Sequence, residues 1–228
     1  MKKLIIFALA AAVIIPGYSQ DKQQPQQQSA APEKKIEKSE SAIVDTKSYN
    51  EIVLEDFEAS QYAKKNIDFL VSRNQQGDLS IREEFPAQNG RSKKYLGVKF
   101  FGRKGDTLKI YPAKDLIIND YCREIAVWVY GKKFSGELSM MIQDAGGDNH
   151  RLILGKLDFL GWRKLVIRLG SEVRQEDDLL SQKKFIKILH FQYRPGNQTQ
   201  QPIWHYFYLD DITAMVREKY TDRQSDDW

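Results

Sequence analysis

Apolar and polar residues alternate over several short stretches in the second half of this chain. Residues 124–130, 138–142 and 165–169 each carry apolar side chains at every second position, which is the pattern of a strand with one buried face. The first of these strands is predicted to stop at Gly131, and the sequence Asp-Ala-Gly-Gly-Asp at 144–148 supplies a turn, because Gly tolerates positive φ. We therefore expect three consecutive antiparallel strands between residues 124 and 169.

Weaker patterns predict further strands on either side of this run. A last strand over 203–216 is apolar on both faces in places, as expected in the middle of a sheet. The remaining predicted strands are 51–57, 67–71, 96–101, 107–111 and 185–193, with a turn at 75–78, a hairpin loop at 102–105 and a loop with one helical turn at 171–184. About ten short strands and no long helix indicate an all-β fold, an antiparallel β-sandwich or jelly roll in a single domain.

The N-terminal part of the chain has a different character. Residues 1–19 combine a Lys-Lys start, a short apolar run and small residues before Gln20, which is typical of a secretory signal peptide and too short to span a bilayer. Residues 20–46 are rich in Gln, Pro, Ser and Lys, so we expect a disordered tether. The predicted organisation is signal peptide 1–19, tether 20–46, β-sandwich domain 47–217 and polar C-terminal tail 218–228.

Charge and motif content exclude several function classes. The formal charge of +4 falls to +2 once Lys2 and Lys3 leave with the signal peptide, and acids and bases are interspersed, so no nucleic-acid partner is expected. No membrane contact is expected after signal cleavage. Cys122 is the only cysteine, so the exported domain must be held by its core rather than by an internal disulfide. No nucleophile elbow, zinc-protease motif or phosphate-binding loop occurs, and we expect no enzyme activity.

Several segments together carry a family resemblance. They are Arg123-Glu-Ile-Ala-Val-Trp-Val-Tyr-Gly131, then 138–144, Leu154-Gly-Lys-Leu157, Gly161-Trp-Arg-Lys-Leu-Val166 and Tyr208-Leu-Asp-Asp-Ile212. In this order they resemble the spirochaetal flagellar filament outer layer proteins of the FlaA type, over roughly residues 51–216. The resemblance implies a structural sheath subunit of a periplasmic flagellum that contributes to filament shape and motility. It also implies core filament proteins and other sheath proteins as partners, and a location in the periplasm.

The same skeleton is similar to carbohydrate-binding jelly rolls of the galactose-binding-like kind, which leaves a second hypothesis. Trp162, Trp204 and Tyr206, with Tyr208, could form a platform that stacks on a glycan. The alternative is that these aromatic residues pack the sandwich or serve protein contacts, with Trp162 closing one end of it. The alternative function is therefore a non-catalytic carbohydrate-binding module of the cell envelope.

Two adjacent acids in the last strand suggest a cation site. Asp210 and Asp211 should point to opposite faces of a regular strand, so at least one needs a partner. A structural calcium bound by Asp210, Asp211 and Glu55 is one interpretation, with Asp56 or Glu58 as further oxygen donors. Capping of backbone amides or pairing with Arg or Lys is the other, and we expect no cofactor besides this calcium.

Overall fold

The computed structural model describes residues 48–71, 76–88, 91–176 and 185–219. The predicted signal peptide, tether and nearly all of the C-terminal tail lie outside the described residues. Within these ranges the chain forms β1 (Asn50–Glu55), a 3₁₀ helix (Lys64–Asn66), β2 (Ile67–Leu70), β3 (Gln76–Arg82), β4 (Tyr95–Gly102), β5 (Thr107–Ile110), β6 (Leu116–Ile118), β7 (Tyr121–Lys132), β8 (Gly136–Gln143), β9 (Asn149–Lys156), β10 (Leu160–Arg168), β11 (Ile186–Pro195) and β12 (Ile203–Arg217).

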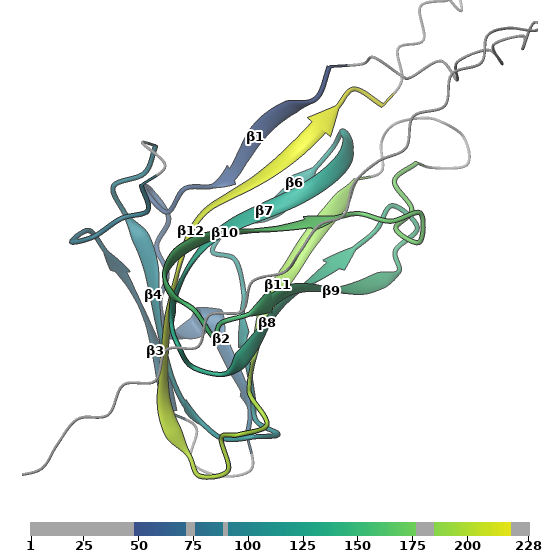
Figure 1. Ribbon diagram of the computed structural model, residues 1–228. Coiled ribbons are helices and arrows are strands. Elements are labelled where there is room, and N and C mark those ends of the chain that lie inside the picture. The colour runs from purple at the N-terminus through teal and green to yellow at the C-terminus, as the bar shows by residue number, and fades with distance from the viewer. Residues whose placement is uncertain (1–47, 72–75, 89–90, 177–184, 220–228) are drawn as a thin grey trace, which may run out of the picture. The chain divides into compact units, whose positions relative to one another are not determined.

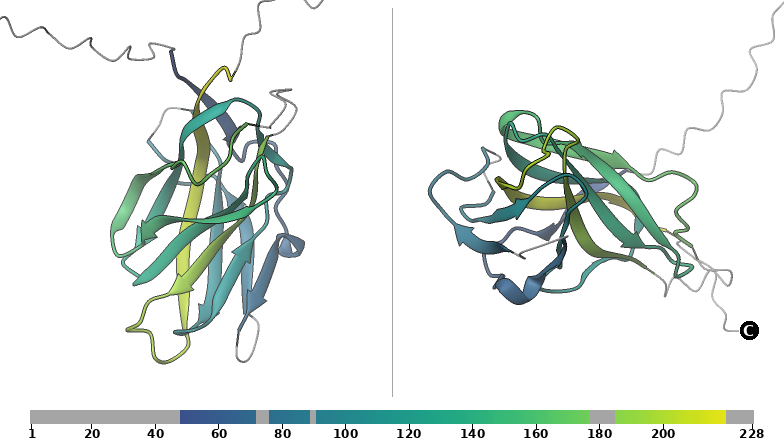
Figure 2. Two further views of the ribbon diagram at one scale, coloured as in Figure 1. Left: turned by 90° about the vertical axis from the view of Figure 1, so that its right-hand side faces the viewer. Right: turned by 90° about the horizontal axis from the view of Figure 1, so that it is seen from below.

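The strands form two antiparallel sheets that face each other. Sheet A has the order β10-β7-β12-β4-β3, with β1 paired to the far half of β12, and sheet B has the order β2-β5-β11-β8-β9, with β6 paired to β11. Figures 1 and 2 show the two layers, with β3, β4 and β12 in one and β8, β9 and β11 in the other. This arrangement confirms the predicted all-β sandwich.

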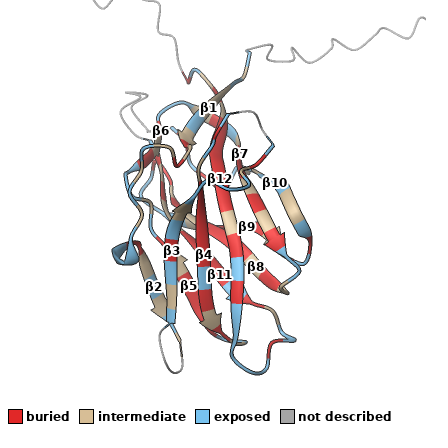
Figure 3. Ribbon diagram, turned by 90° about the vertical axis from the view of Figure 1, so that its left-hand side faces the viewer, coloured by how far each residue is buried: buried red, intermediate tan, exposed pale blue. Residues whose placement is uncertain are grey.

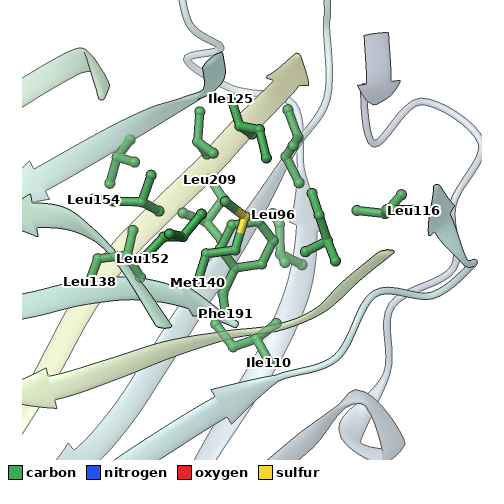
Figure 4. Close-up of a cluster of buried hydrophobic side chains, with 14 of the residues drawn as sticks. Leu96, Ile110, Leu116, Ile125, Leu138, Met140, Leu152, Leu154, Phe191 and Leu209 are labelled. Carbon is green, nitrogen blue, oxygen red and sulfur yellow. The ribbon is translucent and has the colours of Figure 1, made fainter. Parts of the chain in front are cut away.

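The core lies between the sheets and is filled by the inward-facing residue of each alternating pair. Leu138, Met140 and Ile142 from β8 meet Val127 and Leu209 across the sandwich, and all five side chains are at most 1% exposed. Figure 4 shows side chains from both sheets meeting in this cluster. Burying one such side chain contributes roughly 1.5–3 kcal/mol, so the core, without any disulfide among the described residues, holds the domain together.

The run from residue 124 to 169 follows its predicted alternation but contains four strands instead of three. β9, between the predicted second and third strands, was missed, although Leu152 and Leu154 of this strand alternate inward. β7 continues through Gly131 to Lys132 instead of stopping there. β7 and β10 pair in sheet A, whereas β8 and β9 pair in sheet B, so the run crosses from one sheet to the other and back.

One predicted hairpin and one predicted turn were wrong. Residues 102–105 make a turn, in which the Asp106 amide donates to the Arg103 carbonyl, but the strands on either side belong to different sheets and do not form a hairpin. Gln76, Gly77 and Asp78, predicted as part of a turn, are paired with β4 in β3. Glycine is required at position 77 because a Cβ there would lie only 2.7 Å from the ring of Phe69, so close packing leaves no room for a side chain.

The loop prediction at 171–184 is only partly described. Residues 171–176 form a turn and bends without a helix, and the rest lies outside the described residues. Gln175 ties this segment to β7, because its amide donates to the Cys122 carbonyl (2.8 Å) and its side-chain oxygen accepts from the Cys122 amide (2.7 Å). Cys122 itself is fully buried, and burial raises the pKa of its thiol to about 12.

The last strand, β12, lies in the middle of sheet A, as predicted. It pairs with β7 along one side and with β4 and then β1 along the other. Figure 3 shows β4 and much of β12 as buried, while β3 is mostly exposed or intermediate. β12 therefore organises the sheet whose outer side carries the candidate site.

Candidate binding face

Four aromatic rings form a continuous cluster on the outer side of sheet A. Tyr95 (β4), Tyr130 (β7), Trp162 (β10) and Tyr208 (β12) contact one another in a cycle of edge-to-face pairs, with centroid distances of 5.5–5.6 Å. Tyr130 is the direct cross-strand partner of both Trp162 and Tyr208, so the register brings the rings together. Such pairs add about 0.5–1.5 kcal/mol each beyond area burial. We call these four residues the ring cluster.

The segment that joins β3 to β4 runs over the ring cluster. This connector comprises residues 83–94, of which 89 and 90 lie outside the described residues. The Trp162 indole N–H donates to the Phe85 carbonyl (3.1 Å). The Asp210 carboxylate accepts from the Ala87 amide (3.2 Å) and from the Ser92 hydroxyl (2.7 Å). The connector is therefore fastened to the outer side of sheet A at both described ends.

Two recesses open on this side of the sheet and share Tyr208. The aromatic recess, of about 310 Å³, lies between the connector and the ring cluster, and it is lined by Glu84, Phe85, Lys132 and the four rings. The polar recess, of about 240 Å³, is lined by Asp78, Ser80, Arg82, Gly97, Val98, Lys99, Tyr206 and Tyr208. An apolar floor with a few polar groups at its rim is the usual make-up of a binding site.

The predicted platform is divided between two places on this side. Trp204 and Tyr206 lie together near the start of β12, with ring centroids 6.4 Å apart and an interplanar angle of 31°, and each is more than a third exposed. Trp162 belongs to the ring cluster instead and does not close an end of the sandwich. We call the outer side of sheet A, with the ring cluster and the Trp204–Tyr206 pair, the aromatic face.

Sequence reasoning missed Tyr95, Tyr130, Phe85 and Lys132 as members of this face. Tyr130 carried a usable signal, since it is out of phase with the inward-facing Val127 and Val129 and must therefore point outward. Phe85 carried none, because its placement depends on the path of the connector. Lys132 has the same phase as Tyr130 and was missed because the strand was predicted to stop at Gly131.

The two acids of β12 occupy a β-bulge. The pairing with β7 shifts between Asp210 and Ile212, and Asp211 has a positive φ of 36°. The extra residue resets the alternation, so that Leu209 and Ile212 both face the core. The prediction of opposite-facing carboxylates was therefore wrong. Asp210 lies under the connector, and Asp211 interacts with the charges of Arg91, Asp56, Glu51 and Lys164.

Burial dominates the electrostatics of these two acids. Asp210 is fully buried, and desolvation raises the pKa of its carboxyl to about 6 in spite of the hydrogen bonds from Ser92 and Ala87. Desolvation also raises the pKa of Asp211. Nearby Glu51 behaves oppositely, because a hydrogen bond from Lys164 (2.8 Å) and contacts with Arg91 lower its pKa to about 2.

The predicted calcium ligands are not gathered into one donor set. The Glu55 carboxylate accepts from the Phe57 amide (2.9 Å) and the Ser60 hydroxyl (2.8 Å), and it lies 3.7 Å from the Lys114 amine. Within the part of the chain that the structure describes, no three His, Cys, Asp or Glu side chains form a group suited to a metal ion. Asp56 and Glu58 instead accept backbone amides, and calcium binding stays a prediction.

Residues 78–223 match the sequence model of a protein family, the flagellar filament outer layer protein FlaA. This range covers well over half of the chain, including both recesses and the bulge. The chain belongs to the FlaA family. The resemblance inferred from the strand-end motifs is thereby confirmed.

Two curated relatives agree with the FlaA assignment. The putative flagellar filament outer layer-like protein of Brachyspira hyodysenteriae is 24% identical over 149 residues, which cover 62% of this chain and 67% of that protein. The flagellar filament outer layer protein of Spirochaeta aurantia is 28% identical over 117 residues, which cover 46% of this chain. The alignment spans only a third of the Spirochaeta protein's own length.

Several solved structures similar to this FlaA chain are carbohydrate-binding modules. The family 11 carbohydrate-binding module of a Clostridium thermocellum cellulase has a TM-score of 0.44 and 12% identity, with coverage of 76% of this chain and 98% of that one. The Clostridium thermocellum family 11 module in complex with a β-1,3-1,4-mixed-linked tetrasaccharide has a TM-score of 0.45 and 15% identity. The match covers 75% of this chain and 98% of that one. The likeness concerns the fold.

Among the residues described, no helix of this chain is long and apolar enough to cross a membrane.

Proposed function

We propose that this chain is a sheath subunit that coats the filament of a periplasmic flagellum and contributes to filament shape and motility. Membership in the FlaA family supports the sheath role, and the predicted signal peptide at 1–19 supports the periplasmic location. The subunit acts by binding, without catalysis. Its partners are the core filament proteins and other sheath proteins.

The observation that carries the proposal is the aromatic face. Tyr and Trp are enriched at the centres of protein interfaces, where they provide most of the binding energy. Here six Tyr and Trp side chains share one side of sheet A, and Phe85 beside them is 79% exposed. Tyr95 is buried, whereas Phe85, Trp204 and Tyr206 are each more than a third exposed. A protein in isolation rarely leaves several large apolar side chains exposed on one face, so we assign this face to the filament contact.

Co-sedimentation of the mature chain with filaments stripped of their own sheath tests the proposal. We expect the native chain to pellet with filaments and Tyr208→Ala to bind at least about 10-fold more weakly, as for an interface hot spot. Arg151→Ala, in β9 of sheet B, is the matched control and should bind normally. In cells, deletion of the gene should change filament thickness or curvature and reduce swimming. Failure of the native chain to pellet, or unaltered filaments in the deletant, would count against the sheath role.

A second candidate function is glycan binding, and the Trp204–Tyr206 pair favours it. Two partly exposed rings, tilted by 31° to each other, can cover the apolar faces of sugar rings, while Asp78, Ser80 and Arg82 in the adjoining polar recess can bond hydroxyls. Calorimetry of the mature chain with soluble oligosaccharides separates the two functions. A Kd below the millimolar range that is lost in Trp204→Ala would support the glycan function, and absence of heat would reject it for the sugars used.

A further inference from the structure

One lysine at the mouth of the aromatic recess differs from the other cations of the aromatic face. The Lys132 amine lies 5.6 Å from the ring centre of Tyr206 and 5.4 Å from that of Tyr208. Among the described residues, no carboxylate lies within ion-pair distance of this amine. The neighbouring cations are paired, Lys99 with Asp78 and Arg82 with Glu84, at 3.6 Å each. The rim of the recess therefore presents one uncompensated positive charge.

The position of Lys132 makes this charge effective in binding. A lysine over two aromatic rings is held near them by attraction to the ring faces, so less side-chain entropy is lost when a partner binds. A partner that covered the recess would also remove water from around the amine. Charge pairs are stronger when desolvated, and a buried amine without an anion would oppose binding. The recess thus favours a partner that brings a carboxylate.

The opposite wall of the same recess is apolar and fixed. The Phe85 carbonyl is held by Trp162, yet its side chain is 79% exposed. The connector that carries Phe85 is in turn fastened through Ala87 to the buried Asp210. The backbone that carries Phe85 is therefore fixed, and Phe85 lines a recess of about 310 Å³, the volume of roughly ten waters. An apolar side chain fits this space.

We propose that the aromatic recess receives an extended segment of a filament protein that carries an acidic residue next to an apolar one. The carboxylate pairs with the Lys132 amine, and the apolar side chain enters the recess between Phe85 and Trp162. This inference rests on the proposed filament contact and names the chemistry of its partner.

The test measures binding of the mature chain to stripped filaments as a function of charge and salt. Lys132→Glu should weaken binding at least about 10-fold, and Lys132→Ala by several-fold, as for other close interfacial charge pairs. Lys156→Glu, an exposed lysine of β9 in sheet B, is the matched control and should change binding less than twofold. Added salt should weaken filament binding of the native chain more steeply than filament binding of Lys132→Ala, because the variant has lost the ion pair that salt screens.

The outcomes separate this inference from the function on which it rests. If Phe85→Ala and Tyr208→Ala weaken binding while Lys132→Glu does not, the face contacts the filament but the acidic partner is wrong. If the native chain binds and none of these variants weakens it, the recess is not the contact and the inference falls. If the native chain does not bind at all, the sheath function itself fails. Unchanged melting temperatures of the variants show that each effect is on binding.

Discussion

The outer faces of the two sheets share exposed ion pairs but differ in what else they carry. On sheet B, long charged side chains pair across strands, as Arg151 does with Glu137 and Ser139, and Lys187 with Asp115 at 2.9 Å. Sheet A also carries exposed ion pairs, such as Lys99 with Asp78 and Lys164 with Glu51. In addition it carries a cluster of aromatic rings, a connector that shields a buried acid, and two recesses. Exposed ion pairs contribute little energy and mainly keep a surface soluble and unpaired. The aromatic face is therefore the one suited to binding.

The largest expected effect concerns Asp210, the acid that is buried beneath the connector on sheet A. Because the folded pKa of Asp210 is raised to about 6 from 3.8, its protonated form favours the fold, and this contribution is lost as pH rises through 6. Between pH 4.5 and 7 the native chain should lose about 2 kcal/mol of unfolding free energy relative to Asp210→Asn. Urea unfolding of both proteins across this range measures the difference. Parallel pH profiles would show that Asp210 does not titrate there.

Removing one hydrogen bond of the connector should have a smaller effect. Trp162→Phe keeps a ring in the cluster but loses the indole N–H that donates to Phe85, at a cost of about 1 kcal/mol. Amide hydrogen exchange in residues 83–88 should become faster while exchange in β11 stays the same. Equal protection in both proteins would mean that the remaining hydrogen bonds, among them those to Asp210 and Glu58, hold the connector.

Filling the polar recess should affect binding more than stability. In Gly97→Ala the new methyl group would lie 3.1 Å from the Arg82 side chain, which can move, and 3.3 Å from the Ser80 carbonyl. We expect less than about 1 kcal/mol of change in the unfolding free energy. Binding of the partner that occupies this recess should fall several-fold in filament sedimentation or oligosaccharide calorimetry. Normal binding to both would remove the polar recess from the contact.

The smallest effect is expected on sheet B. Glu137→Gln breaks a pair with Arg151 in which both side chains are about a third exposed, so the cost should lie between about 0.2 and 1 kcal/mol. In thermal melts, the difference in melting temperature between the native chain and the variant should be smaller at high salt than at low salt, because salt screens the pair. A loss of filament binding in this variant would break the proposed contrast between the two faces.

The sequence predicted the strands far better than the site. Alternation located β8, which buries nearly every second residue, and the apolar residues on both faces of 203–216 located β12 in the middle of a sheet. The alternation also contained the bulge, since the inward phase of Phe207 and Leu209 changes at Ile212, but Asp210 and Asp211 were interpreted as a regular pair. The ring cluster depends on the register that sets Trp162 beside Tyr130. The recess depends on the connector, whose path no local pattern specifies.

The length of β12 has a mechanical consequence. This strand of 15 residues is bonded to β7 on one side and to β4 and β1 on the other, with hydrogen bonds perpendicular to its axis. A pull along the strand must shear many of these bonds at once instead of opening them one after another. Because Tyr206 and Tyr208 project from the same strand, tension applied at the aromatic face would pass directly into this long, doubly paired strand, which suits the proposed contact with a filament.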